Sequence, residues 1–241
     1  MITDVKNYLV GIAVGIRFRA NFKLEDKFGS IVDEILYSHD SFFNPVLFPE
    51  VLSNPVEKKL INQTTGNHFS INASNIILEL NIGEDINIAD IHEINRRFHD
   101  DIVKGILEKF EISQINRIGY IKKYLFNIEQ LSDVFVNKTI GNTVEGVNDI
   151  NLRFSKKFPV MKSMAKQDIN DYHNVIYNII KKADKKEIFF SIDYQNYFSP
   201  PLNTAIQLKY MEFINDMEKY NALNYTQWLN AYCSETDAQE K

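Results

Sequence analysis

The sequence predicts an α+β fold with a large, mostly antiparallel sheet and two similar halves. Apolar residues alternate with a period of two in several segments and recur at helical spacing in others, and the order of these segments repeats along the chain. Several strand-like segments of the first half follow one another without a helix between them. That order disfavours a doubly wound parallel sheet.

The first half opens with a strand and a helix. From Val10 to Arg19, apolar side chains alternate with small or cationic ones, as is typical of a half-buried strand. Residues 24–37 are expected to be helical because apolar residues recur there every three or four positions. Residues 42–55 contain three prolines and are predicted to be irregular or to form an edge strand.

A meander and a long helix follow. The predicted elements are strands at 58–63, 68–72 and 75–82, a helix at 87–112, a strand at 115–126, a short helix at 128–136 and a turn-rich boundary at 141–146. Asn87 or Asp90 is expected to cap the long helix. The apolar stripe of this helix consists of Ile91, Ile94, Phe98, Ile102 and Ile106.

The second half repeats this plan in a shorter form. The predicted elements are strands at 150–158, 175–181 and 187–197, a loop at 168–171, and helices at 203–220 and 225–233, the last carrying Trp228. We therefore divide the chain into a first half at 1–141, a second half at 147–233 and a frayed tail at 234–241.

Two sequence blocks support an internal duplication. Ile16-Arg17-Phe18 matches Leu152-Arg153-Phe154, and Ile76 through Ile102 aligns without gaps onto Ile188 through Ile214. Chance similarity between apolar strand–helix units is the alternative explanation. The order of one strand, one helix, several strands and one helix resembles the repeated unit of the TATA-binding-protein fold, and also helix-grip folds. A fold analogy of this kind carries no function.

Composition excludes several classes of protein. The chain has 241 residues, 27 Lys and Arg against 32 Asp and Glu, and a net charge of −5. Its single cysteine excludes a disulfide framework and a cysteine-ligated zinc site. The apolar run from Leu9 to Ile16 is far shorter than the roughly 20 residues of a membrane-spanning helix. We expect a cytoplasmic protein that does not enter the membrane.

Strand phase predicts a polar patch on the sheet face opposite the core. If Ile16 and Phe18 face the core, Arg17 and Arg19 face the other side. The candidate binding residues on this face are Arg17, Arg19, Glu79, Asn81, Arg153 and Asp193. Arginine is a planar, bidentate donor for carboxylate or phosphate. The alternative is that Arg17–Glu79 and Arg153–Asp193 are ordinary cross-strand ion pairs.

Other clusters give weaker indications of chemistry. His92 and His99 do not have the four-residue spacing of a zincin helix. Asp168, Asp171 and His173 could bind a hard cation, and a capped turn explains them equally well. Cys233 is expected to be an inert thiol. No catalytic residue, metal ligand or cofactor is assigned.

Three short segments carry a resemblance: Ile16-Arg17-Phe18, Arg117-Ile118-Gly119-Tyr120-Ile121, and Ser191-Ile192-Asp193-Tyr194 followed by a helix ending near Trp228. They resemble segments of a sporadically distributed family of bacterial proteins of similar length. The family typically has a Gly-x-Arg-Tyr-Ile-Asn-Arg-like strand, whereas Lys122 and Lys123 stand here in place of Asn and Arg. The resemblance implies an α+β protein of uncharacterised activity and supplies no catalytic residues.

These observations favour a binding or interaction protein over an enzyme. The expected partner is a protein or a small anionic ligand, and the family's sporadic distribution suggests an accessory role in a bacterial defence or toxin-regulating system. One alternative is nucleic-acid binding through short basic runs such as Lys156-Lys157, although this is not favoured because the chain is acidic overall. The other is a metal-dependent hydrolase or nuclease that uses Asp168, Asp171 and His173.

Overall fold

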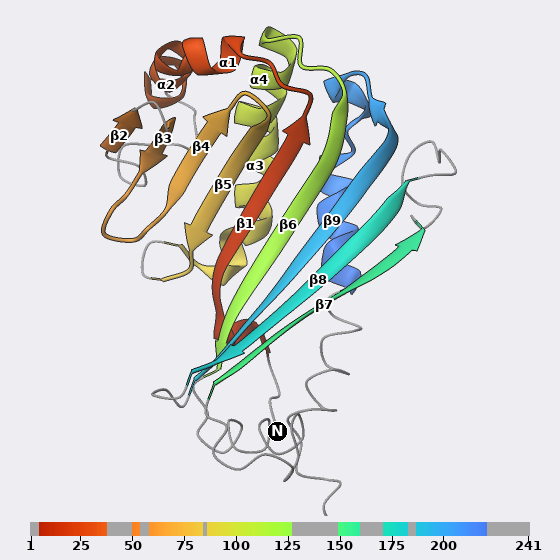
Figure 1. The fold of residues 1–241 in the computed structure, drawn as a ribbon. Coiled ribbons are helices and arrows are strands. Elements are labelled where there is room, and N and C mark those ends of the chain that lie inside the picture. Colours follow the sequence, from red (N-terminus) through yellow and green to blue (C-terminus); the bar gives the residue numbers. More distant parts are fainter. Residues whose placement is uncertain are drawn as a thin grey trace, which may run out of the picture.

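Nine antiparallel strands form one sheet, with helices packed on one of its faces (Figure 1). These elements come from a computed structural model that describes residues 5–37, 50–53, 58–83, 86–126, 149–159, 171–182 and 187–220. The predicted α+β class and the largely antiparallel sheet are confirmed.

The strand order places the first strand of the chain in the middle of the sheet. The order is β2-β3-β4-β5-β1-β6-β9-β8-β7. The strands are β1 (Leu9–Phe18), β2 (Glu50–Ser53), β3 (Lys58–Ile61), β4 (His68–Asn72), β5 (Asn75–Asn81), β6 (Ile115–Phe126), β7 (Ile150–Pro159), β8 (Tyr172–Lys181) and β9 (Ile188–Leu202). Each strand predicted by the period-two pattern is present, and β2 lies at the edge of the described sheet.

Most helices follow the predicted positions. They are η1 (Val5–Tyr8), α1 (Lys23–Asp26), α2 (Phe28–Tyr37), η2 (Ile88–Asp90), α3 (Ile91–Arg97), the π-helical η3 (Phe98–Val103), α4 (Lys104–Lys109), η5 (Ala205–Gln207) and a helix over 210–220. Of the two predicted caps, Asn87 precedes η2 and its side chain accepts a hydrogen bond of 3.1 Å from the Ala89 backbone N–H. Asp90 precedes α3 and forms no side-chain capping bond to the described residues of that helix.

The core lies between the sheet and the helices of its covered face. All five residues of the predicted stripe on the long helix are buried. From β1, Ile12, Val14, Ile16 and Phe18 are buried against them. Phe98 packs edge-on against Tyr210, with ring centroids 6.3 Å apart, so the two helical segments are in contact. No described helix covers the opposite face of the sheet, which we call the open face (Figure 1).

A buried polar contact ties these helices to the centre of the sheet. Asn95 of α3 donates to the Tyr120 hydroxyl of β6 at 3.2 Å and accepts from the Tyr210 hydroxyl at 3.3 Å. Asn95 also donates to the Ile91 carbonyl at 3.0 Å. One amide therefore satisfies two tyrosine hydroxyls that would otherwise be buried without partners.

The predicted helix over 203–220 is wrong at its start. The strand β9 continues through Pro200 and Pro201 to Leu202, and the α-helix begins only at residue 210. The pairing of β6 with β9 is irregular between Ile115 and Arg117, and proline is tolerated in a sheet at such irregularities. The predicted elements at 128–136, 141–146 and 225–233 and the tail at 234–241 lie outside the described residues.

Candidate functional site

Two glycines lie opposite each other at the centre of the open face. Gly15 of β1 pairs with Gly119 of β6 on one side and with Ile77 of β5 on the other. Gly119 in turn pairs with Gln195 of β9. Because neither glycine has a side chain, the sheet surface is hollowed between the neighbouring side chains.

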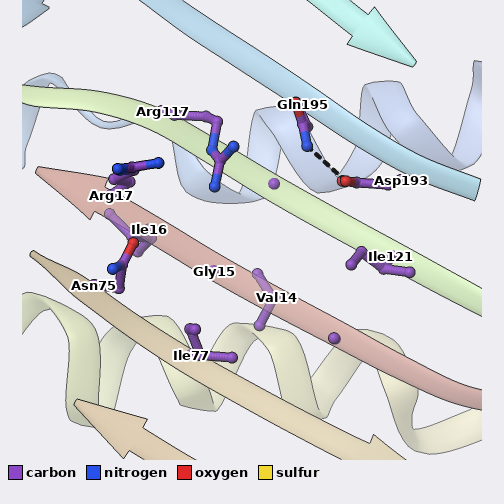
Figure 2. A pocket seen from close by; sticks show the side chains of 12 residues that line it. Val14, Gly15, Ile16, Arg17, Asn75, Ile77, Arg117, Ile121, Asp193 and Gln195 are labelled. Atoms are coloured by element: carbon purple, nitrogen blue, oxygen red, sulfur yellow. Dashed lines mark hydrogen bonds between the residues drawn. The ribbon is translucent and has the colours of Figure 1, made fainter. Parts of the chain in front are cut away.

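The hollow has a volume of about 130 Å³ (Figure 2). We call it the Gly15–Gly119 hollow. Its lining residues on the open face include Ala13, Arg17, Asn75, Ile77, Arg117, Ile121, Asp193 and Gln195. The polar side chains lie at one end of the hollow and along β9, while Ile77 and Ile121 make other parts of its lining apolar (Figure 2).

The two glycines are not needed for backbone geometry. A Cβ on Gly15 would lie 3.7 Å from the Ile77 Cγ1 atom, and a Cβ on Gly119 would lie 3.7 Å from the Asp193 Oδ1 atom. Both distances are ordinary van der Waals contacts, and neither residue has a positive φ. What the glycines contribute here is space.

Two arginines face each other at one end of the hollow. Arg17 of β1 is the cross-strand partner of Arg117 of β6. Arg17 is exposed, and no hydrogen bond or ion pair with another described residue holds its guanidinium. Like charges directly opposite each other destabilise a sheet, so this end of the hollow favours an anion.

A chain of hydrogen bonds orients Arg117. Its Nη1 donates to the Tyr197 hydroxyl at 3.3 Å, and its guanidinium carbon lies 5.7 Å from the centre of that ring. The Tyr197 hydroxyl donates to Gln195 Oε1 at 2.9 Å. Gln195 is buried, and its Oε1 also accepts from Asn174 at 3.2 Å. Arg117 is therefore held by groups that are themselves fixed.

The same network reaches Asp193. Gln195 Nε2 donates to Asp193 Oδ2 at 2.5 Å (Figure 2). Burial raises the pKa of Asp193, while the bond from Gln195 and the charges of Arg117 and Arg153 lower it by a smaller amount. Asp193 Oδ1 accepts no hydrogen bond from the described residues, and it overhangs Gly119. A free acceptor atom thus faces the hollow.

The structure brings together only some of the predicted binding residues. Arg17 and Asp193 both line the hollow. Arg153 lies on β7 at the edge of the described sheet, where it is exposed. Arg19 lies beyond the end of β1 and donates to Gln114 at 3.5 Å. Asn81 donates through its side chain to the Thr65 carbonyl, which is a structural contact in the described chain.

The predicted cross-strand ion pairs are wrong. Arg17 pairs in register with Asn75, whereas Glu79 lies beside Ala13 and forms its ion pair with Lys123. The register partner of Asp193 on β8 is Ile176, and β8 separates Asp193 from the strand that carries Arg153. The predicted orientation is nevertheless confirmed, because Arg17 and Asp193 share the open face.

Arg117, Gln195 and Tyr197 are absent from the sequence-based candidates. Arg117 and Gly119 fall at alternate positions of a period-two strand, which places them on one face. That signal could have selected Arg117. The register that sets it opposite Arg17 joins residues far apart in the chain, and no local pattern contains this information.

The other candidate clusters are engaged in structural contacts where the structure describes them. Asp171 Oδ1 accepts from the Ser199 backbone N–H at 2.6 Å. His173 is buried against Phe158, with ring centroids 5.2 Å apart. The His99 ring stacks on the Tyr210 ring, with ring centroids 4.9 Å apart. Asp168 and Cys233 lie outside the described residues.

Within the described part of the chain, no three His, Cys, Asp or Glu residues are grouped to hold a metal ion, and no helix is long and apolar enough to cross a membrane. Neither a scan against protein-family models nor a search of curated proteins gives a match to this chain. The resemblance to the sporadic bacterial family stays a prediction.

Proposed function

We propose that this is a binding protein whose open sheet face holds an acidic group of a ligand or partner between Arg17 and Arg117. The cross-strand pairing of these two arginines beside the hollow is the observation that carries the proposal. An anion between them would replace a repulsion with two charge-assisted hydrogen-bonding contacts. The two guanidiniums and the carboxylate around the hollow suit recognition of a ligand by charge.

The strand order also supports the proposal that the chain consists of two related halves. The central strands β1 and β6 are neighbours. Outward from β1 lie β5, β4, β3 and β2, and outward from β6 lie β9, β8 and β7. Each group runs from a central strand through a meander to a helix, an order similar to the TATA-binding-protein unit. This equivalence matches β1 with β6, whereas the sequence alignment matched β1 with β7.

The Gly15–Gly119 hollow would then lie where the two halves meet. Arg17 and Arg117 come one from each central strand, so both halves contribute a cation to the same anion site. The proposed halves therefore divide between α4 and β6, rather than at residues 141–147.

Nuclear magnetic resonance of the two glycine amides tests the proposed function. Valerate, a short carboxylic acid, is the probe. We expect it to shift the Gly15 and Gly119 amide signals in a saturable way, and to lose this effect in the Arg17→Ala/Arg117→Ala variant. Arg19→Ala is the matched control, because Arg19 lies on a neighbouring position outside the hollow. Valerate binding that survives the double substitution would contradict the proposal.

Nucleic-acid binding predicts a different outcome. Lys157 and Arg153 add cations on β7. The Nζ atom of Lys157 lies 5.2 Å from the centre of the Tyr172 ring. Phosphate-backbone binding would give strong retention on heparin that falls steeply with salt. We expect weak retention, because Asp193 and Glu79 share this face with the arginines.

A further inference from the structure

The hollow carries opposite charges at separate places. Arg17 and Arg117 stand at one end (Figure 2). The Asp193 Oδ1 atom lies near Gly119, 3.7 Å from where a Cβ of that residue would be. Within the described residues, Asp193 forms no ion pair with either arginine at 4 Å or less, and its only hydrogen bond in the hollow comes from Gln195 through Oδ2. The cationic and anionic groups are therefore available to one ligand at the same time.

The spacing of these groups limits the ligand. Arg117 and Gly119 are two residues apart on one strand, so their Cα atoms are separated by about 7 Å at the usual rise of an extended chain. The Gly15–Gly119 pair forms the floor beside Arg117, and Ile77 of β5 lines the hollow on the far side of Gly15. The hollow is small, with a volume of about 130 Å³. A short apolar body with a polar group at each end fits these limits.

We propose, on the basis of the proposed function, that the hollow binds a small zwitterion whose carboxylate meets Arg17 and Arg117 and whose ammonium meets Asp193 Oδ1. The two charged groups of such a ligand are several atoms apart, as in an ω-amino acid. An α-amino acid has its ammonium and its carboxylate on the same carbon, so it would reach either the two arginines or Asp193, but not both.

The rigidity of the site supports this ligand. Gln195 is buried and fixes both Asp193, through Nε2, and Tyr197, through Oε1. Tyr197 in turn holds Arg117. The distance between the anion-binding and cation-binding groups is thus set by one buried amide, and preorganisation of this kind reduces the entropic cost of binding.

Isothermal titration calorimetry with four probes tests the proposal. The probes are δ-aminovalerate, valerate, pentylamine and glycine. We expect δ-aminovalerate to bind at least about tenfold more tightly than valerate or glycine, a difference of about 1.4 kcal/mol, and pentylamine to bind weakest. Asp193→Asn should remove the advantage of δ-aminovalerate over valerate. Arg17→Ala/Arg117→Ala should abolish binding of both acids, and Arg19→Ala should leave all four unchanged.

The outcomes separate the two proposals. Equal affinity of wild-type protein for valerate and δ-aminovalerate would overturn the zwitterion and leave the acid-binding function standing. A δ-aminovalerate advantage that persists in Asp193→Asn would also overturn it. If neither acid binds the wild-type protein, the zwitterion and the anion site both fail. Circular dichroism of each variant confirms that it is folded.

Discussion

The arginine pair is a residue-level feature with a cost to stability. Arg17 and Arg117 are cross-strand neighbours, an arrangement in which like charges repel. Arg117 is partly compensated by Tyr197, whereas Arg17 is exposed. Local features that oppose folding are expected at functional sites. A bound acid would remove this cost.

Replacing one arginine should therefore stabilise the protein in the absence of an acid. We expect Arg17→Gln to raise the free energy of unfolding by about 0.5 kcal/mol at low salt, and the gain to shrink at high salt because exposed charges are screened. Urea unfolding at two salt concentrations measures this. Arg19→Gln, the control, should change little; a loss of stability in Arg17→Gln would count against the repulsion.

Filling the hollow should separate binding from folding. Gly119→Ala adds a methyl group at van der Waals distance from Asp193. We expect unfolding free energy to rise by about 0.5 kcal/mol, since alanine restricts the unfolded chain, while affinity for δ-aminovalerate falls. Thermal unfolding and calorimetry measure the two effects. Unchanged affinity would place the ligand elsewhere on the face.

A buried histidine should make stability depend on pH. Burial lowers the pKa of His173 to about 4, against an opposing effect of Asp216 and a backbone hydrogen bond with Gln195. The unfolded chain then binds a proton at higher pH than the folded protein. The neutral, buried His173 therefore makes its full contribution to the free energy of unfolding above about pH 6.5. This contribution is lost as the pH falls toward about 4.

The His173→Gln variant checks this contribution. We expect the wild-type protein to lose unfolding free energy on the order of 3 kcal/mol between these two pH values, and the variant to lose clearly less. Urea unfolding across the pH range supplies the slope. Identical slopes would show that other groups control acid stability.

The sequence predicts correctly which face of the sheet a residue lies on, because this depends only on the alternation of side chains along its own strand. The period-two pattern places Arg17 and Asp193 on the open face, as the structure has them. It does not reveal Arg117 as the neighbour of Arg17, because register between distant strands depends on tertiary packing. For the same reason the alternative pairing of Arg17 with Glu79 does not form, since Glu79 pairs with Lys123, and Arg153 stands at the edge rather than in the hollow.

At the scale of elements, the Asn95 amide joins α3, β6 and the helix over 210–220. The amide satisfies the hydroxyls of Tyr120 and Tyr210, both buried. Buried polar networks of this kind strengthen a unique packing arrangement when every member is satisfied. The sequence predicted the apolar stripe beside Asn95 and not the amide contact, because its partners come from distant elements.

Removing this amide should cost more than removing one of its partners. We expect Asn95→Ala to lower the free energy of unfolding by about 2 to 3 kcal/mol, since two buried hydroxyls lose their partner, and Tyr210→Phe by about 1 kcal/mol. The double variant should lose less than the sum of the two. Additive losses in chemical unfolding would show that the residues do not form one network.

Helices and strands could be predicted where the period of their apolar residues was unbroken. The strands β1, β5 and β6 follow their patterns closely, whereas the helix predicted at 87–112 is divided into η2, α3, the π-helical η3 and α4. The pair Pro200-Pro201 misled the prediction, because proline also fits the start of a helix. Here the irregular pairing of β9 with β6 accommodates both prolines within the strand.

At the scale of the whole molecule, the nine-stranded order sets β1 and β6 at the centre. Every strand except β2 could be predicted from the sequence, and β2 lies in the segment predicted to be irregular or an edge strand. The order could not be predicted, since it depends on which distant strands pair. The central pair explains why the hollow, the arginines and Asp193 come together from three strands. It is also the basis for proposing two related halves.

A crystal structure with a bromine-labelled short carboxylic acid tests the central claim most directly. Anomalous scattering locates the bromine independently of the protein atoms. We predict a peak in the Gly15–Gly119 hollow, with the carboxylate within hydrogen-bonding distance of Arg17 or Arg117, and no such peak in the Arg17→Ala/Arg117→Ala variant. A peak elsewhere on the protein with an empty hollow would contradict the account.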